Sequence, residues 1–375
     1  MGFRFLHTAD WQIGKPYGNV PGDAGAELRA QRLRTVERLA QIATERQLDA
    51  VLVAGDVFDS NEVSQRTIDR LLNAMEGFAG PWVLLPGNHD AALAHSVWTR
   101  LRHMGPAANI VVADTPTPIS LWQDRAVVLP APLRRRREAL DQTDWFDAAE
   151  TPPGAIRIGL AHGTLPGRLP GLAEAGNPIA ENRAATARLD YLALGDWHGT
   201  HQIAPRTWYS GTHETDRHRD NDSGYALIVE IEAPGARDRV KAIATGHFAW
   251  RALTVDIVDG SIAAALDAVA AAATDPARSV ISLTVRGTLG LAQRHALERE
   301  LSAWEARLHH LEFNLDQLVE EPSDDDLDAL GTSGLIRTTV ERLKALALQP
   351  SHPDADAARV ALRMLYLHHM QSDTK

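Results

Sequence analysis

Short apolar runs that end in polar residues recur along the amino-terminal part of the chain. They cover residues 3–6, 50–54, 82–85, 156–160 and 191–194. Runs of this kind are typical of parallel strands that are buried on both faces of a sheet. The pattern therefore predicts several parallel strands in this part of the chain.

Helical periodicity separates the first three of these runs. Between the first two, an apolar stripe lies opposite a face of Glu and Arg, and it consists of Leu28, Leu33, Val36, Leu39, Ala40 and Ala43. Before the third run, Ser64 is placed to cap a helix that buries Ile68, Leu71, Leu72 and Met75. The order strand, helix, strand, helix, strand predicts an α/β domain, because parallel strands need crossover connections.

Each apolar run is followed by side chains that carry oxygen or nitrogen donors. The third leads into PGNHD, and the others lead into segments that contain Asp10 and Gln12, Asp56 and Asp59, His162, and Asp196 and His198. In an open α/β sheet, ligands bind beyond the carboxyl ends of the strands. Taken alone, PGNHD also fits an ordinary turn, and His162 also fits a structural histidine. The repetition at five strand ends favours one shared site.

A buried cluster of acids and histidines is costly unless its charges are paired or bind a metal. The candidate metal ligands are Asp10, Gln12, Asp56, Asn88, His162, Asp196 and His198. Seven donors are enough for two divalent ions that lie about 3.5–4 Å apart and share a bridging carboxylate. The chain has no cysteine, so sulfur ligation is excluded.

These motifs resemble those of the calcineurin-like metallophosphoesterases. The resemblance rests on D-W-Q at 10–12, G-D-V-F-D at 55–59, G-N-H-D at 87–90, H-G at 162–163 and G-D-W-H at 195–198. Within that superfamily, HTADW, GDVFD and the later YSGT are most similar to the SbcD-type nuclease subunits that work with SMC-like ATPases. The motif match covers residues 1–215.

The resemblance implies a role for each matching residue. Asp10 and His198 would bind the first metal, Asp56 would bridge, and Asn88 and His162 would bind the second. His89 would be the catalytic acid or a transition-state contact, oriented by Asp90, and Asp59 would be an outer group that fixes a ligand or loop. Substrate contacts are also expected from the charged stretch 207–220, through Tyr209, His213, Arg217 and Arg219, although that stretch fits a solvated loop equally well.

Two positions depart from the family pattern. The family motif D-x-H ends in histidine, whereas this chain has Gln12 at that position. The family motif G-H-x-H has histidine as its second residue, whereas this chain has Asp196 there. Both changes replace an imidazole by an oxygen donor, and oxygen donors favour manganese or magnesium over zinc. We therefore expect two divalent ions, with manganese preferred and magnesium possible. The alternative is a site that has decayed.

The resemblance implies a four-layer α/β core, an α+β sandwich, with smaller elements after it. We expect a metallophosphoesterase (nuclease) domain at 1–248 and a capping domain at 249–320, built as strand, helix, strand, helix, strand. An acidic linker and a carboxyl-terminal helical segment at 321–375 would follow, and that segment would either dock an ATPase partner or pack on its own domain.

Composition limits the partners. With a formal net charge of −11, the chain is not expected to bind DNA tightly in the absence of a partner. Its one dense basic run is Arg134–Arg137, which fits either a contact with a phosphate backbone or a solvated loop. No run is long enough to span a membrane and the first residues enter a strand, so we expect no membrane partner, no signal peptide and a cytoplasmic location.

The sequence thus predicts a metal-dependent phosphodiesterase. The most specific interpretation is a DNA exonuclease or endonuclease that acts with an SMC-like, SbcC-type ATPase in repair, recombination or defence, with a homodimer as a possible assembly. One alternative is a phosphoesterase that acts on a small phosphorylated metabolite or a cyclic nucleotide. Another is a decayed structural subunit that only regulates an ATPase.

Overall fold

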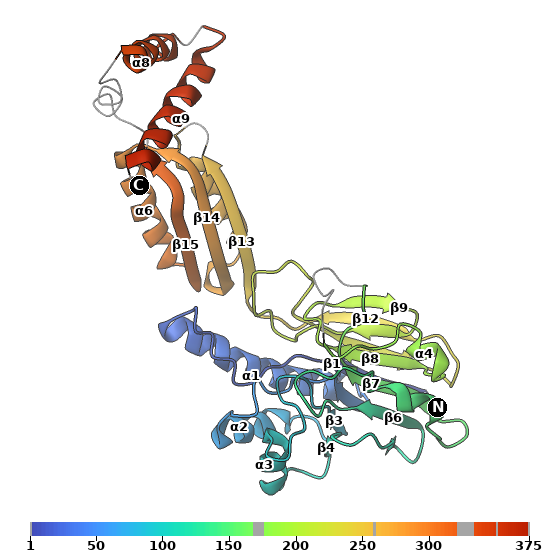
Figure 1. Cartoon of the computed structure of the whole chain (residues 1–375). Helices are drawn as coiled ribbons and strands as arrows, with labels where there is room; N and C mark the ends of the chain where they lie inside the picture. Colours follow the sequence, from blue (N-terminus) through green and yellow to red (C-terminus); the bar gives the residue numbers. More distant parts are fainter. Residues whose placement is uncertain (1, 168–175, 258–259, 321–333, 350–351, 374–375) are drawn as a thin grey trace. The chain divides into compact units, whose positions relative to one another are not determined.

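The computed structural model describes residues 2–167, 176–257, 260–320, 334–349 and 352–373. It divides into two compact units, Met1–Trp250 and Arg251–Lys375, each of which is described by itself (Figure 1). Within the described residues, no helix is long and apolar enough to cross a membrane.

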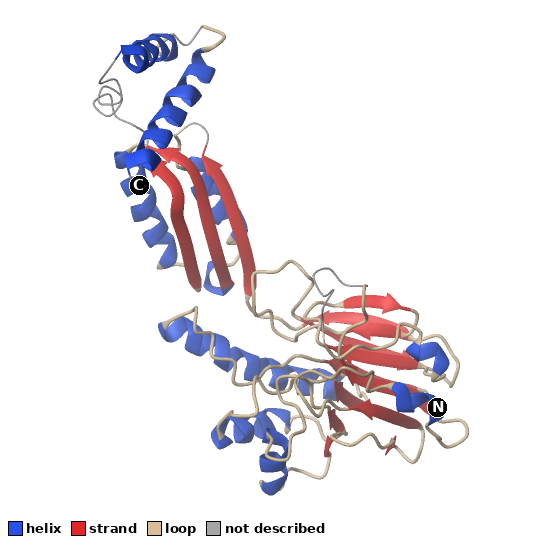
Figure 2. Ribbon diagram, viewed as in Figure 1, coloured by secondary structure: helices blue, strands red, loops and turns tan. Residues whose placement is uncertain are grey.

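Two six-stranded sheets form the frame of the first unit (Figure 2). The first sheet has the order β12-β11-β1-β2-β3-β4, and the second has the order β5-β6-β7-β8-β10-β9. The strands of the first sheet are β1 (Phe3–Thr8), β2 (Ala50–Val53), β3 (Trp82–Leu84), β4 (Ile110–Val112), β11 (Tyr225–Ile231) and β12 (Arg239–Ala244). Those of the second are β5 (Ile119–Leu121), β6 (Ala126–Ala131), β7 (Ile156–His162), β8 (Tyr191–Gly195), β9 (His201–Ala204) and β10 (Thr207–Tyr209).

Helices cover the outer faces of both sheets. On the first sheet these are α1 (Gly22–Glu45), α2 (Gln65–Met75) and α3 (Val97–His103), and on the second they are the short η1 (Asp144–Ala148) and α4 (Arg183–Thr186). As predicted, Ser64 caps α2, because its side chain accepts a hydrogen bond from the amide of Thr67.

The alternation of side chains along each strand builds the layers. In β2, Val51 and Val53 pack against the helices, whereas Ala50 and Leu52 face the second sheet. The sheets meet through a core that includes Phe5 of β1, and apolar residues such as Leu129 and Phe146 bury the far face of the second sheet. The result is helix, sheet, sheet and helix, so the predicted four-layer α/β class is confirmed.

Parallel pairing brings the predicted strand ends to shared edges. Strands β1 to β4 run parallel in the first sheet, and β6, β7 and β8 run parallel in the second. The pair β11 and β12 forms an antiparallel hairpin beside β1, with Pro234 and Gly235 between its strands. The donor residues that follow β1, β2, β3, β7 and β8 therefore lie at the carboxyl edges of the two sheets.

The described residues of the second unit form a three-stranded sheet, the helices α5 and α6, the short helix η2 and a carboxyl-terminal helical pair. The sheet has the order β13-β14-β15, and the elements are β13 (Ala249–Ile257), α5 (Ala263–Ala272), η2 (Pro276–Arg278), β14 (Ser279–Leu289), α6 (Leu291–Glu305), β15 (His310–Glu320), α8 (Gly334–Ala347) and α9 (Ala355–Asp373). Strand β13 starts inside the first unit. Most of the acidic stretch predicted to be a linker lies outside the described residues, and the capping role and the domain bounds stay predictions.

Candidate metal centre

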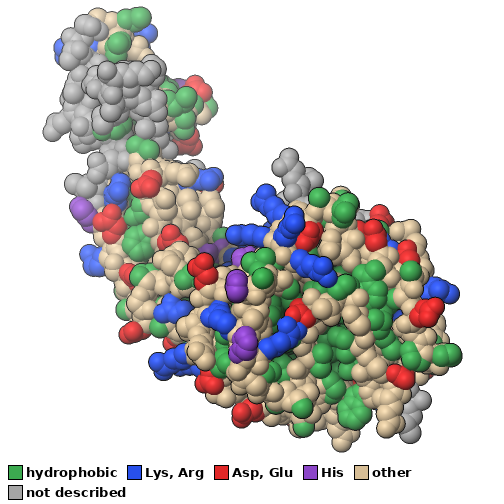
Figure 3. Space-filling view, turned by 60° about the horizontal axis from the view of Figure 1, so that its bottom comes forward, with side chains coloured by type: hydrophobic (Ala, Val, Ile, Leu, Met, Phe, Trp, Pro, Cys, Tyr) green, Lys and Arg blue, Asp and Glu red, His purple; other side chains and the backbone are tan. Residues whose placement is uncertain are grey.

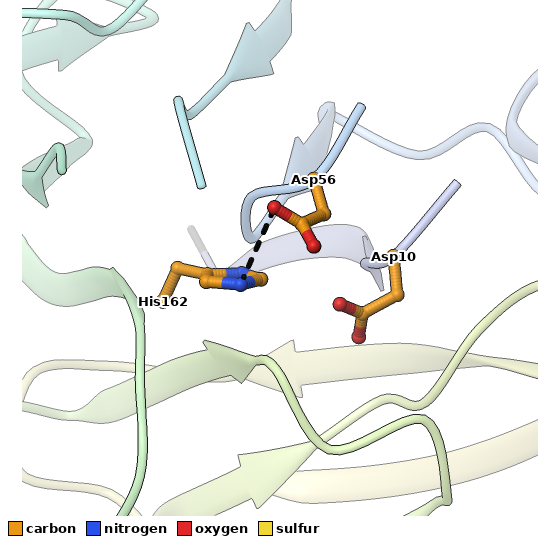
Figure 4. Close-up of side chains that lie close together, drawn as sticks. All are labelled: Asp10, Asp56 and His162. Atoms are coloured by element: carbon orange, nitrogen blue, oxygen red, sulfur yellow. Dashed lines mark ion pairs between the residues drawn. The ribbon is translucent and has the colours of Figure 1, made fainter. Parts of the chain in front are cut away.

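Buried acidic and imidazole side chains converge where strands of the two sheets end. Asp10 follows β1, Asp56 follows β2, and His162 is the last residue of β7. One ligand atom from each lies within 4.8 Å of the others, and all three residues are buried. Figure 4 shows the three side chains directed toward one another from separate segments. Buried carboxylates this close together repel each other, so the arrangement calls for a cation.

Three oxygen atoms surround the Nε2 atom of His162. The distances from Nε2 are 3.0 Å to Asn88 Oδ1, 3.5 Å to Asp56 Oδ1 and 3.8 Å to Asp196 Oδ1. Ligands that bind one ion at about 2.1 Å and at right angles lie roughly 3 Å apart, so this spacing suits a shared ion. We call Asn88, His162, Asp56 and Asp196 the second-metal group.

The ring of His162 is held in the tautomer that a metal ligand needs. Its Nδ1–H donates to the carbonyl oxygen of Ala54 at 2.8 Å, which leaves the lone pair on Nε2. That lone pair and the Asn88 oxygen then face each other as two acceptors, which is favourable only with a cation or proton between them. Burial lowers the pKa of His162, but Asp56, Asp10 and Asp196 outweigh it and raise the pKa to about 9. The residues present therefore fit a divalent ion.

A second group of donors gathers around Asp10. The Nε2 atom of His198 lies 4.0 Å from Asp10 Oδ1, and the amide of Asp196 lies 3.2 Å from the same oxygen. The main-chain amide of Gln12 connects this residue to the same region, because it donates to the main-chain carbonyl oxygen of Asp56 at 2.8 Å. We call Asp10, Gln12 and His198 the first-metal group. Burial raises the pKa of Asp10, and the two histidines oppose that shift.

The backbone is strained at four of the candidate ligands. Asp10, Gln12, Asp56 and Asp196 have φ angles of 53°, 40°, 52° and 100°. Residues other than glycine rarely adopt positive φ, and such strain collects at functional sites where the surrounding structure imposes it. Here the strained turns aim side chains back across the edge of the sheet.

His89 lies beside the metal groups, and its ring is oriented differently from the prediction. Its amide donates to Asp56 Oδ1 at 2.9 Å, and its Nδ1 pairs with the main-chain carbonyl of Asp59 at 2.9 Å. The expectation that Asp90 orients this ring needs correction. The Asp90 carboxylate accepts instead from the amides of Phe58 and Gly87, at 2.9 and 2.7 Å, and so joins the two loops that carry Asp56 and Asn88.

Burial governs the ionisation of Asp90. It raises the pKa of this carboxyl group to about 8, with Asp56 adding to the shift and the two amide hydrogen bonds opposing it. Asp59 was expected to fix a ligand or loop, and it contacts the ring of His89 through its main-chain carbonyl oxygen. Both residues thus act on the loops around the site.

The expected substrate-contacting residues fall into two groups. Tyr209 and His213 are fully buried, and they pair with the carbonyl oxygens of Gly163 at 2.8 Å and Arg32 at 2.9 Å. That placement disfavours direct contact with a substrate. The side chain of Arg217 is 45% exposed and reaches the ring of His198, so it is accessible from the site.

Several supporting residues were not identified from the sequence. Asp216 is buried and contacts His198 Nδ1 at 3.3 Å, while Lys15 Nζ donates to Gln12 Oε1 at 3.1 Å. The buried guanidinium of Arg32 donates to the carbonyl oxygens of Asp10 and Trp11, at 2.8 and 2.6 Å, and thus fixes the first ligand loop. Its position on the buried face of α1, four residues after Leu28, was the one available signal.

The comparison with known families agrees with this architecture. The model of the calcineurin-like phosphoesterase family matches residues 3–249, and the chain belongs to that family. The match confirms the resemblance predicted from the motifs. It also supports the coarse activity, a metal-dependent phosphoesterase, for which the two donor groups are the candidate centre.

Curated relatives are similar at modest identity. The SbcD subunit of the nuclease SbcCD from Rhodobacter capsulatus is 39% identical over 94 residues, 24% of this chain and 22% of that protein. The corresponding SbcD subunit from Escherichia coli is 28% identical over 159 residues, covering 39% and 37% of the two chains. The DNA double-strand break repair protein Mre11 of Methanosarcina acetivorans is 24% identical over 264 residues, covering 68% and 41%. The chain spans less than half the length of each of these relatives.

Gly87 offers a direct test of how tightly the site is built. A Cβ atom at this position would lie 2.2 Å from Asp56 Oδ1 and 2.4 Å from the Asp56 amide, so Gly87→Ala must displace the carboxylate between the two metal groups. We expect at least about a tenfold loss of Mn²⁺ affinity, measured by isothermal titration calorimetry. Gly18→Ala is the matched control, because nothing lies within 4 Å of the added atom. Equal Mn²⁺ affinity in both variants would show that Asp56 is not a ligand.

Proposed function

We propose that this protein is a DNA phosphodiesterase that uses two divalent ions, manganese by preference, and acts with a coiled-coil ATPase of the SMC type. The observation that carries the proposal is the convergence of two donor groups on Asp56 at the carboxyl edge of the sheets. Asp10, Gln12 and His198 would hold one ion, and Asn88, His162 and Asp196 the other. The similarity to nuclease subunits supports DNA as the substrate.

Two divalent ions bound there would clamp a phosphodiester, lower the pKa of a bound water and stabilise the charge that develops on the transferring phosphoryl group. His89 would donate a proton to the departing oxygen. Its Nδ1 is engaged with the Asp59 carbonyl, so Nε2, which lies 4.0 Å from Asp56 Oδ2, is the nitrogen available for this step. The amide of His89 also orients the Asp56 carboxylate.

Basic side chains near the same edge support a polyanionic substrate. Arg134–Arg137 are exposed and follow the carboxyl end of β6. Strand β6 pairs in parallel with β7, which ends at His162, so the arginine run leaves the same edge of the sheet. Arginine is well suited to phosphate oxygens. Together with Arg217, these residues are candidates for contacts with the DNA backbone.

The need for a partner follows from charge. The formal net charge is −11, and in Figure 3 basic side chains are interspersed with acidic and apolar ones over the face drawn.

The helical pair of α8 and α9 exposes Leu335, Ile336 and Met364, by 84%, 53% and 66%. Exposed apolar side chains on helices are typical of docking surfaces, and the proposed ATPase would cover them.

His89 and Asp56 should affect the reaction in different ways. We expect His89→Ala to keep both ions but to lose about 10²-fold in kcat on DNA, the usual scale for a general acid, and Asp56→Ala to lose the ions as well. Hydrolysis of labelled DNA and metal analysis of the same samples measure both effects. His103→Ala, a change at an exposed histidine of α3, is the control.

The outcome of that experiment also separates the rival activities. Loss of metal in His89→Ala would contradict the catalytic assignment. Hydrolysis of small phosphate esters or cyclic nucleotides without cleavage of DNA would replace the proposed substrate. Wild-type protein that binds metal but hydrolyses none of these compounds would indicate a decayed site.

Metal preference should follow from Gln12 and Asp196. Because both are oxygen donors where the family has imidazole, we expect Mn²⁺ to support the highest activity, Mg²⁺ some and Zn²⁺ little. Gln12→His combined with Asp196→His should raise the affinity for Zn²⁺ about tenfold or more relative to Mn²⁺, as measured by competitive titration. Highest activity in the zinc-loaded wild type would contradict the assignment of these two ligands.

DNA binding should depend on the partner. We expect the isolated chain to bind duplex DNA with a Kd no tighter than about 1 µM at physiological salt, the range of non-specific binding. A coiled-coil ATPase encoded beside this gene should tighten binding by adding a second attachment. Fluorescence anisotropy with labelled duplex measures both states, and tight, salt-sensitive binding by the isolated chain would contradict this division of labour.

A further inference from the structure

The two metal groups differ in which side chains already contact their donor atoms. In the second-metal group, apart from the member His162 itself, the contacts to the carboxylates come from neutral donors. The hydroxyl of Thr164 donates to Asp196 Oδ2 at 2.6 Å, and the amide of His89 donates to Asp56 Oδ1 at 2.9 Å. These donors position the carboxylates without adding a positive charge.

Cationic side chains contact the first-metal group. Lys15 Nζ donates to Gln12 Oε1 at 3.1 Å, which is the oxygen that would bind the ion. Arg217 Nη2 lies 2.9 and 3.2 Å from the two ring nitrogens of His198. Two of the three donors in this group are therefore engaged by a positive charge.

Lys15 is more enclosed than Arg217. Its ammonium also contacts Asp216 Oδ2 at 2.7 Å, and the Asp216 side chain is only 1% exposed. The side chain of Lys15 is 21% exposed and that of Arg217 is 45% exposed, so Lys15 is the better shielded of the two cations. Its ammonium is therefore held beside Gln12 by a buried carboxylate.

We propose that Lys15 is a positioning residue that makes the first-metal group the weaker of the two metal sites. The inference rests on the proposed two-metal function. The Gln12 carbonyl oxygen has two lone pairs, so it can accept from Lys15 with one and bind an ion with the other. The ammonium then lies one atom away from the ion and repels it across a short, partly desolvated distance. The second-metal group fills first, and activity follows the filling of the first.

A purely structural role for Lys15 predicts the opposite effect of its removal. If the ammonium served only to hold Asp216 and His198 in place, loss of Lys15 would weaken metal binding. Asp216 keeps two other partners, however, because Arg217 Nε donates to its Oδ1 at 3.0 Å and His198 Nδ1 lies 3.3 Å from the same oxygen. His198 therefore stays oriented without Lys15, and removal of the charge should tighten the site.

The experiment is a titration of the metal-free full-length protein with Mn²⁺. Calorimetry measures the heat of binding, and electron paramagnetic resonance measures the concentration of unbound Mn²⁺. Wild type should bind two ions with unequal affinities. Lys15→Met should tighten the weaker site by about tenfold or more and leave the tighter site unchanged, and Lys15→Gln should do the same. Lys15→Arg keeps the charge and should keep the weak site. Lys241→Met removes a lysine charge from an exposed position of β12 and should match wild type.

The possible failures are distinguishable. Two ions bound by Lys15→Met with wild-type affinities, or with a weaker first site, would overturn the role of Lys15 while leaving the two-metal function intact. Wild-type protein that binds at most one ion at saturation would overturn the two-metal function, and this inference with it. The Mn²⁺ concentration needed for half-maximal hydrolysis should fall in Lys15→Met in parallel with the tighter binding.

Discussion

Mutual repulsion between buried carboxylates is the constraint on which this structure depends. Asp10 and Asp56 are buried, and they share one small volume with the partly exposed Asp196. Within the part of the chain that the structure describes, no cation of equal charge lies between them. His162 is the main positive group that it supplies, and the raised pKa of this ring is the response to that field. A pair of divalent ions removes the repulsion. Without such ions, burial of these carboxylates would destabilise the fold, and this is the reason to assign them to a metal centre.

The fold holds this unfavourable cluster by rigid means. Parallel strands with apolar cores on both faces deliver the ligands to one edge, and strained turns at Asp10 and Asp56 direct the side chains inward. The loops are then fixed by polar groups that lie beneath them. Arg32 binds the carbonyl oxygens of the first loop, and Asp90 binds amides of the next two. Each of these buried polar side chains is satisfied by main-chain atoms, so the site is preorganised before any ion binds.

The sequence predicted the parts of this structure that depend on local pattern. The buried strands, the amphipathic α1 and the Ser64 cap follow from residue spacing and local hydrogen bonding, and the strand ends follow from the parallel order. The contacts of Lys15 with Asp216 and of Arg32 with Glu214 join residues that are far apart in the chain, and no periodicity encodes them. The partner of His89 was mispredicted for a related reason. The adjacent Asp90 was the obvious choice in the sequence, whereas the turn directs its carboxylate away and places a carbonyl from another loop beside the ring.

The most direct test of a centre with two metals bridged by Asp56 is anomalous diffraction from crystals of the protein saturated with Mn²⁺. The account predicts two anomalous peaks about 3.5–4 Å apart, both in contact with Asp56. One should be bound by Asp10, Gln12 and His198, and the other by Asn88, His162 and Asp196. A single peak at saturation, or two peaks that do not share Asp56, would contradict it.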